Sequence, residues 1–402
     1  MFDIAVIGCG PAATITAIGL QRLGYSVVVI GRVRKLHVVE GISERVYQAL
    51  QQQGLHQAVQ QVSDPVPRYA CWNGENNNAN HERLIDRQQF DTALIDELQT
   101  AGVSFRSDTV VKVDDQDNCW CIRTRSGELM HARFLAEARG RSAPLGKTDC
   151  LRGPETVSLG QLWQIPEAAH AAMTQVITTE NGWLWVARLK NGQCFTQCSI
   201  HATSETTPSK QNTRQFLQQQ LNSHPLTEKL LNNAIPMGEC IARSSTPVLV
   251  KQPIGINFIR IGDAAMAVDP LSGNGIFQSL SSALSAPSVI NTILAKPEST
   301  ALAMQFYRDR INHLFYRFCR LGRDFYRMET QWQNAPFWSA RNSWPDNLPA
   351  HPDQDRIVGK EMRPVLNQNF IELKEVVITT GQPLGIWKVG NIPATDFFRK
   401  TI

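Results

Sequence analysis

Two glycines and an alanine near the start of the chain have the spacing of a phosphate-binding loop. The segment GCGPAA carries Gly8, Gly10 and Ala13 in the pattern G-x-G-x-x-G/A, between an apolar run and a helical pattern. Gly8 permits a tight turn, Gly10 leaves room for a pyrophosphate, and Ala13 lets the helix pack closely on the strand. Pro11 and Ala12 open that helix, whose N-terminus faces the phosphates. The loop predicts nucleotide binding, and a structural glycine turn is the alternative.

A second glycine-rich segment, GDAAMAVDPLSGNG at residues 262–275, lies far along the chain. Gly262 and Asp263 end a buried apolar run, where the carboxylate can accept hydrogen bonds from the ribityl hydroxyls of a flavin. The following turn lets backbone approach a flat ring, and the helix N–H groups there can stabilise negative charge. Its residues are Pro270, Gly273, Asn274 and Gly275. The two segments in this order specify FAD better than either one alone.

The second apolar strand, VVVI, ends where a dinucleotide-binding fold usually carries an acidic residue for the adenosine ribose. Gly31 occupies this position, and Arg32 follows it. We therefore expect the ribose to be held differently, by backbone or by Arg32, whose charge also suits the pyrophosphate.

Over about residues 1–330, the two motifs resemble the FAD-dependent monooxygenase and halogenase superfamily of aromatic hydroxylases. The resemblance implies Asp263 on the ribityl chain and the glycine-rich turn against the isoalloxazine. It also implies that Arg45, after the second strand, and Arg87, in LIDRQQF, contact the flavin or its linker. Glu40, beside the expected flavin pocket, is the candidate for a proton role. A structural salt bridge from Glu40 is the alternative.

A narrower resemblance rests on GRVRKLHVVEGISERV, EARGRSAP, WPDNLPAH and LGIWKVG. These stretches are similar to the flavoproteins that modify the precursors of cysteine tryptophylquinone oxidases, such as glycine and lysine oxidases. The resemblance implies a monooxygenase that hydroxylates a specific tryptophan in a partner oxidase precursor. It implies O2 and NAD(P)H as further reactants.

The chain departs from the halogenases of the superfamily in two places. Trp183-Leu184-Trp185 continues with Val186-Ala187 and lacks the proline of the halogenase motif WxWxIP, and residues 36–111 contain no lysine to relay hypohalous acid. Both departures favour hydroxylation. The two tryptophans can equally pack a core from one face of a strand. In Glu137-Ala138-Arg139, an arginine replaces the aspartate of the motif that assists NAD(P)H use in many aromatic hydroxylases.

The elements expected around these motifs predict an α/β fold. We expect a Rossmann-type FAD-binding domain, a mixed-sheet substrate domain and a C-terminal extension that caps the substrate or meets a partner. The expected ranges are 1–150 with 241–330, 151–240, and 331–402. Strands are expected at about 103–135 and 156–200, and helices at 274–328 and 40–60, the latter interrupted at Gly54. The polar stretch WNGENNNAN is expected to form a loop.

Residues 305–328 combine an aromatic stripe with six arginines. The pattern predicts a helix that packs its aromatic side and leaves the arginines in solvent. A docking surface for an acidic partner protein is the alternative interpretation.

Composition sets limits on the function. The chain has 402 residues, 42% hydrophobic and 19% charged, with a net charge of +4, which does not indicate nucleic-acid binding. No apolar run reaches the length of a membrane span, and no signal peptide is recognised, so a cytoplasmic protein is expected. Nine cysteines without a CxxC pair predict free thiols and no metal site.

Three classes of function remain open at this point. The first is a monooxygenase that acts on a protein tryptophan, and the second is a small-molecule aromatic hydroxylase or halogenase. The third is a non-catalytic flavin-binding chaperone of an oxidase. An open cleft beside the flavin would favour the first class, and a sealed pocket would favour the second.

Overall fold

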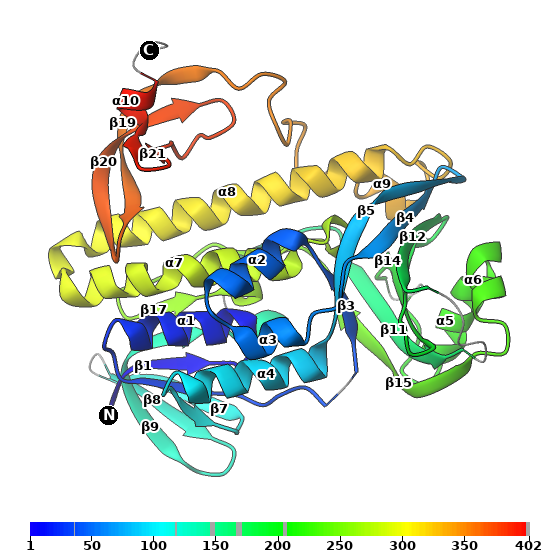
Figure 1. Ribbon diagram of the computed structural model, residues 1–402, viewed down its shortest axis with the longest axis horizontal. Helices are drawn as coiled ribbons and strands as arrows, with labels where there is room; N and C mark the ends of the chain where they lie inside the picture. The colour runs from blue at the N-terminus through cyan, green and yellow to red at the C-terminus, as the bar shows by residue number, and fades with distance from the viewer. Residues whose placement is uncertain (36, 117–118, 145–148, 166–170, 204–206, 399–402) are drawn as a thin grey trace.

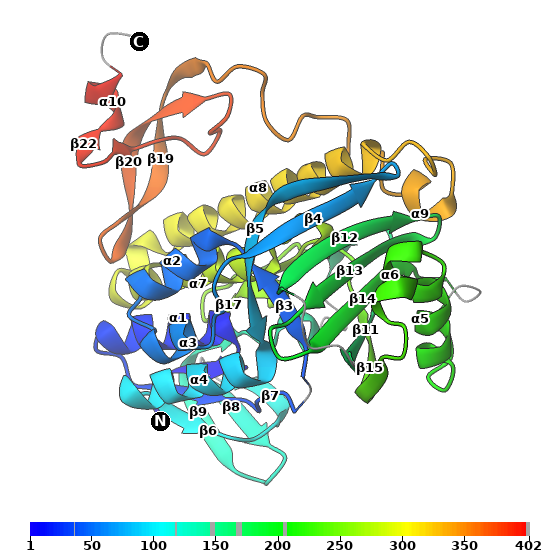
Figure 2. The ribbon, with the colours of Figure 1, turned by 45° about the vertical axis from the view of Figure 1, so that its right-hand side comes forward.

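The structure is a computed structural model with two large β-sheets side by side and a long helix, α8 (Thr300–Arg327), that runs over both (Figures 1 and 2). It describes residues 1–35, 37–116, 119–144, 149–165, 171–203 and 207–398.

The first sheet has seven strands in the order β6-β2-β1-β9-β8-β7, with β17 beside β9. Five of them run parallel, and the apolar runs IAVI and VVVI are buried on both faces, as parallel strands require. The strands are β1 (Phe2–Ile7), β2 (Val27–Ile30), β6 (Ser104–Arg106), β7 (Val110–Gln116), β8 (Cys119–Thr124), β9 (Leu129–Glu137) and β17 (Phe258–Arg260).

Helices cover one face of this sheet, and the β7–β8 hairpin curls over the other. Val110 and Ile122 of the hairpin pack there with Ala5 and Ile30. The covering helices are α1 (Pro11–Arg22), α4 (Arg87–Thr100), α7 (Gly275–Ala295) and α8 (Thr300–Arg327). The helices predicted at 274–328 are confirmed.

The second sheet has eight strands in the order β15-β11-β14-β13-β12-β4-β5-β3, antiparallel except for the pair β12–β4. Its outer face packs on α5 (Thr213–Asn222) and α6 (Pro225–Leu230). The strands are β3 (Val39–Ile42), β4 (Val66–Trp72), β5 (Glu75–Asp86), β11 (Thr156–Gln164), β12 (Met173–Thr179), β13 (Gly182–Arg188), β14 (Gln193–His201) and β15 (Ile235–Ser244). The short strands β10 (Cys150–Arg152), β16 (Val248–Val250) and β18 (Met266–Ala267) form a third sheet where the chain passes between the two halves.

Two predicted elements differ from the structure. The stretch expected as a loop forms the hairpin β4–β5, in which only Asn73 and Gly74, at φ 53° and 75°, make the turn. This is the backbone that a two-residue hairpin turn demands, and pairing with β4 overrides the poor strand propensity of the asparagines. The helix expected at 40–60 begins as β3 and then forms α2 (Glu44–Gln52) and α3 (His56–Gln60), interrupted near Gly54 as predicted.

The C-terminal part packs against α7 and α8. After α9 (Pro336–Ser339), an irregular stretch runs along α8 to the hairpin of β19 (Ile357–Asn367) and β20 (Phe370–Thr379) (Figures 1 and 2). Thr292 Oγ1 of α7 accepts a hydrogen bond of 2.8 Å from the Ile371 backbone N–H, and Asn291 donates to the Asn369 carbonyl. The hairpin is followed by β21 (Lys388–Val389), β22 (Ile392–Pro393) and α10 (Ala394–Phe397).

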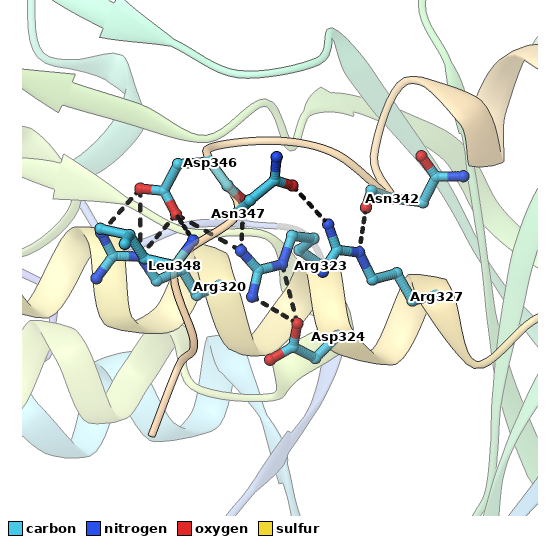
Figure 3. Close-up of polar contacts among 8 residues, drawn as sticks. All are labelled: Arg320, Arg323, Asp324, Arg327, Asn342, Asp346, Asn347 and Leu348. Carbon is cyan, nitrogen blue, oxygen red and sulfur yellow. Dashed lines mark hydrogen bonds and ion pairs between the residues drawn. The ribbon is translucent and has the colours of Figure 1, made fainter. Parts of the chain in front are cut away.

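Three arginines of α8 hold the irregular stretch, here called the strap (residues 342–348; Figure 3). Arg320 Nε and Nη2 lie 2.9 and 2.8 Å from the Asp346 carboxylate, and Arg323 donates to the Asp346 carbonyl. Arg327 donates to the carbonyl of Asn342 and, over 3.0 Å, to the side chain of Asn347. These three arginines therefore bind the chain itself, which neither sequence interpretation anticipated.

Candidate functional site

A cavity of about 710 Å³ lies between the two large sheets. It brings the glycine loop after β1 together with the turn before α7, as the two sequence motifs predicted. Twelve predicted site residues line it: Gly8, Gly10, Pro11, Ala12, Gly31, Arg32, Glu40, Arg87, Asp263, Pro270, Gly273 and Gly275.

Four predicted residues do not line the cavity. Ala13 and Gly262 are buried behind it, and a Cβ on Gly262 would lie 3.1 Å from Ala12 Cβ, so this glycine lets the two motifs touch. Asn274 lies between two lining glycines. Arg45 is exposed on α2 and lies outside the cavity, and its contact with the flavin stays a prediction.

The glycine loop has the geometry of a phosphate cradle. Gly8 has φ +115°, and a Cβ there would lie 2.3 Å from the Ala138 carbonyl oxygen, so only glycine fits. A Cβ on Gly10 would meet no protein atom within 4 Å, because it would point into the open cavity. No side chain caps the N-terminus of α1, which leaves its N–H donors for a ligand. Open space and uncapped donors together fit a bound pyrophosphate.

The structure explains the missing acidic residue after β2. A Cβ on Gly31 would lie 2.9 Å from the Cys9 side chain, so no carboxylate fits there without moving the glycine loop. Asp108, which follows the neighbouring parallel strand β6, lines the same end of the cavity, 3.5 Å from Arg32. Hydrogen bonds from Ser126, Thr124 and Thr109 hold the pKa of Asp108 below its ordinary range. A carboxylate therefore reaches the Gly31 end of the cavity from another strand, β6.

The centre of the cavity is organised by Arg141. Its Nη1 and Nη2 donate to the carbonyls of Thr246 and Val268 over 2.6 and 2.7 Å, and its Nε lies 3.5 Å from Asp263. Burial raises the pKa of Asp263, and Arg141 opposes this rise. Arg139, which replaces the expected aspartate, donates to Glu137. Asp263 thus presents a fixed carboxylate that can accept from the hydroxyls of a ribityl chain.

The turn before α7 has an uncapped helix N-terminus at the cavity. Gly273 has φ +64°, and no side chain caps α7 at Asn274. A Cβ on Gly275 would meet no protein atom within 4 Å. Since helix N-terminal donors favour negative charge, this turn suits a ring that becomes anionic on reduction.

Glu40 is held in an ion-pair network. Both of its carboxylate oxygens lie 2.9 Å from Arg87 Nη1, and Arg87 also donates to Asp91 over 3.0 Å. The Arg87 side chain is 7% exposed, so these carboxylates satisfy most of a buried guanidinium. The geometry is that of the salt-bridge alternative, and the same network engages Arg87, which was expected to contact the flavin.

Strands β13 and β14 give the cavity an aromatic wall made of Trp183, Trp185 and Phe195, and Val176 of β12 lies in the same cavity lining. The rings of Trp185 and Phe195 meet edge to face, with centroids 6.3 Å apart. Trp185 Nε1 donates to Glu82 Oε1 over 3.4 Å. This wall offers apolar ring surfaces that suit an aromatic substrate.

A buried hydrogen-bond chain ties this wall to the turn before α7. Trp183 Nε1 donates to Tyr326 OH over 3.2 Å, and Tyr326 OH donates to Asp269 Oδ1 over 2.9 Å. Asp269 also accepts from the Leu271 backbone N–H. Trp183 therefore packs in a core and also lines the cavity, so the core interpretation of this tryptophan is confirmed.

Sequence patterns missed several lining residues, namely Arg68, Glu82, Asp108, Arg141, Phe195 and Arg243. Asp108 carried a signal, because it is an acidic residue at the end of a short strand. Its relevance depends on β6 pairing with β2, which the sequence does not display.

The charges that line the cavity indicate which kind of ligand it suits, and other features of the chain can be compared with the sequence predictions. Seven arginines and five carboxylates line the cavity, a balance that suits an anionic ligand. All nine cysteines are free, as predicted. Within the described ranges no cluster of metal-binding side chains is found, and no helix there is long and apolar enough to cross a membrane.

Comparison with known proteins places the chain among flavin-dependent enzymes. The tryptophan halogenase family model matches residues 44–356. Among curated proteins, a tryptophan 2-halogenase of Chondromyces crocatus is 23% identical, over 84% of this chain and 70% of that protein. The putative FAD-dependent oxidoreductase LodB of Marinomonas mediterranea is also 23% identical, over 85% of this chain and 97% of that protein.

Two solved structures are similar over nearly the whole chain. The peptidyl tryptophan dihydroxylase QhpG, essential for tryptophylquinone cofactor biogenesis, is 44% identical with a TM-score of 0.88. The match covers 100% of this chain and 92% of QhpG. The flavin-dependent halogenase CmlS, 16% identical with a TM-score of 0.78 over 99% of this chain and 88% of CmlS, shares the fold.

Proposed function

We propose that this chain, which belongs to the tryptophan halogenase family of FAD-dependent halogenases and hydroxylases, hydroxylates a tryptophan of a partner protein. The observation that carries the proposal is the single cavity that joins an open phosphate cradle to an aromatic wall. The likeness to a peptidyl tryptophan dihydroxylase over the whole chain supports the same substrate class. The partner is then the precursor of a quinone-cofactor oxidase.

The protein is a flavin-dependent monooxygenase with FAD as its cofactor. Reduced FAD supplies the activation of O2 for transfer to an electron-rich ring. We assign the pyrophosphate to the Gly10 loop, the ribityl chain to Asp263, and the ring to the turn at Pro270–Gly275. Asp108 and Arg32 are assigned to the adenosine end. NAD(P)H as the reductant and the cytoplasm as the location belong to this proposal.

The chain's own residues orient the substrate and exclude water. Trp185 and Phe195 offer an edge-to-face pair against which an indole can stack, a contact worth about 0.5–1.5 kcal/mol beyond its area. Trp183 and Trp185 donate hydrogen bonds to Tyr326 and Glu82, and these bonds fix the orientation of the wall. The fixed wall in turn orients the indole ring of the substrate. An indole needs no deprotonation before it attacks electrophilic oxygen, so the site requires no strong base.

Halogenation is disfavoured by the side chains around the cavity. The described residues that line it include seven arginines and no lysine. A guanidinium stays protonated, so it does not replace the amine that relays hypohalous acid in halogenases.

Mass spectrometry of the partner tests the proposal. The oxidase precursor is co-expressed with this protein, and its tryptophan-containing peptides are compared with those made alone. We expect one tryptophan to gain the mass of whole oxygen atoms, and to gain no halogen when bromide is added. A Gly10→Val variant, whose side chain fills the cradle, is the matched control. An unchanged tryptophan mass, together with FAD that is reduced but consumes no O2, would instead support a flavin-binding chaperone.

A further inference from the structure

Strand β5 has an open edge beside the cavity. Its residues 75–82 pair with β4 on one side only, while β3 covers the other side at residues 83–86. Among the described residues, no strand pairs with this stretch on its free side. The first seven residues of β5 are all exposed, which corresponds to roughly 20 Å of open edge.

The register shows which backbone groups face the open side. The Arg87 backbone N–H donates to the Val38 carbonyl, next to β3. On the opposite side, the Leu84 N–H donates to Ser63 Oγ and the Leu84 carbonyl accepts from the Ser63 N–H. The backbone N–H and C=O groups of odd-numbered residues therefore point toward β3. The same alternation turns the N–H and C=O of His81 toward the free edge. His81 lies opposite Pro67 of β4. Since proline has no N–H, it is compatible with a non-hydrogen-bonded pair, in which neither residue donates to the other. His81 thus offers a backbone donor and acceptor to an incoming chain.

The hairpin that carries this edge is held rigidly. The side chain of Asn73, in its turn, donates to the Met328 carbonyl over 2.6 Å and accepts from Thr330 N over 2.7 Å. The Asn73 backbone N–H donates to Glu329. The tip of β4–β5 is therefore bound to the end of α8, and an added strand would meet a preformed template.

The composition of the edge lacks the usual protection against strand addition. Natural edges carry lysine, proline or inward charges, whereas ENNNANH has one acidic residue and four asparagines. Asparagine is a poor strand former, so propensity does not explain these residues. A bulge at Ala79 gives some twist, and the polar side chains keep the edge soluble without closing it.

The edge leads into the cavity. Glu82, at its end, lines the cavity together with Gly41 of β3, and a Cβ on Gly41 would lie 2.1 Å from Glu82 Oε2. A strand added along residues 75–82 would continue the line of β3 and end beside these two lining residues. A side chain at its end could then enter the cavity toward Trp185.

We propose that the free edge of β5 binds the substrate segment of the partner protein as an added β-strand. This inference rests on the proposed function and names how the protein substrate is recognised. Backbone pairing gives binding with little dependence on sequence, and the aromatic wall selects the tryptophan.

A proline at His81 tests the edge directly. His81→Pro removes one donor from the free side and leaves the pairing with β4 intact, while His81→Ala removes the side chain and keeps the donor. We expect His81→Pro to raise KM for the precursor about tenfold, as the loss of one hydrogen bond predicts, with FAD content and kcat unchanged. His81→Ala should match the parent.

Synthetic peptides of the hydroxylated segment give a second measurement that does not depend on the variant folding. N-methylation at alternate positions should weaken binding for one set of positions and spare the other. Equal binding of both sets, or an unchanged KM for FAD-loaded His81→Pro, overturns strand addition and leaves hydroxylation in place. A change of oligomeric state on His81→Pro would assign the edge to a second copy of the chain and also overturn it. If the unsubstituted protein adds no oxygen to any precursor, the proposed function is wrong, and strand addition, which rests on it, is wrong as well.

Discussion

At the scale of single residues, two glycines of the site are required for opposite reasons. Gly31 is a glycine because the Cys9 side chain leaves no room for a Cβ. A Cβ on Gly10 would meet no protein atom within 4 Å, and Gly10 lines the cavity where we propose the pyrophosphate binds. We therefore expect a substitution at Gly31 to disturb the protein and a substitution at Gly10 to disturb cofactor binding.

Gly10→Val should fold and lose FAD, because its Cβ meets no protein atom within 4 Å and its side chain enters the phosphate cradle. The flavin absorbance per protein chain measures the loss, which we expect to be nearly complete. Gly322→Ala is the matched control, since a Cβ there also meets no atom within 4 Å but lies on α8, away from the cavity. Full FAD content in Gly10→Val would contradict the assignment of the pyrophosphate.

Glu40→Gln separates the structural from the catalytic role of this carboxylate. Because Arg87 is buried and Glu40 is one of its two anionic partners, we expect a loss of stability on the order of 1–3 kcal/mol. Hydroxylation by the FAD-loaded fraction should be unchanged. A fall in kcat at full FAD content, with unchanged thermal stability, would instead support a role of Glu40 in proton transfer.

The residues that sequence alone identified are those whose role is local. Gly8, Gly10 and Gly273 depend on a turn that their neighbours define, so spacing was sufficient. Asp108 and the pair Trp185–Glu82 depend on strand order and pairing, which couple residues far apart in the chain. Arg45, which was expected to contact the flavin or its linker, is exposed on α2 and lies outside the cavity.

At the scale of elements, α8 joins the two sheets and holds the strap. Its arginine pattern could be predicted from the sequence, but its binding partner could not. Asp346 and Asn342 lie in a stretch without periodicity, and only the packed structure brings them to Arg320 and Arg327. The hairpin β4–β5 was also not predictable from local sequence, because its asparagines favour a loop and only the pairing with β4 makes them a strand.

Asp346→Asn should loosen the strap. Hydrogen bonds from Arg320 lower the pKa of Asp346, so the carboxylate stabilises the folded strap above its unfolded pKa of about 4. At neutral pH we expect a local loss of about 1–2 kcal/mol, seen as faster hydrogen exchange in residues 342–356. The difference from the parent should shrink as the pH falls through the lowered pKa of Asp346. Asp324→Asn is the control, because its carboxylate is 45% exposed and contacts only Arg323 in Figure 3.

At the scale of the whole molecule, α7 connects the cofactor site to the C-terminal hairpin. Its N-terminus opens on the cavity, and Asn291 and Thr292 near its far end bond the hairpin. The two sheets also meet at the cavity, so a ligand there contacts both halves of the chain. Binding of FAD at the proposed site is therefore expected to stabilise the entire fold.

FAD should raise the thermal midpoint of the protein. At a free concentration one hundred times its Kd, a ligand that binds only the folded state stabilises it by about 2.7 kcal/mol. Hydrogen exchange should slow at residues 8–13 and 270–275 together. The Gly10→Val variant should show neither effect, and protection confined to one of the two segments would contradict a shared cofactor.

The glycine loop after β1 and the turn before α7 are far apart in the sequence, and this separation affects when the cofactor can bind during synthesis. Gly10 leaves the ribosome long before Gly275, and at about 5–20 residues per second roughly 10–60 s of translation lie between them. During this interval the nascent chain has a phosphate loop but no turn to receive the ring. With FAD bound at the proposed site, we expect loading to be a late event in biosynthesis, after both segments have been made.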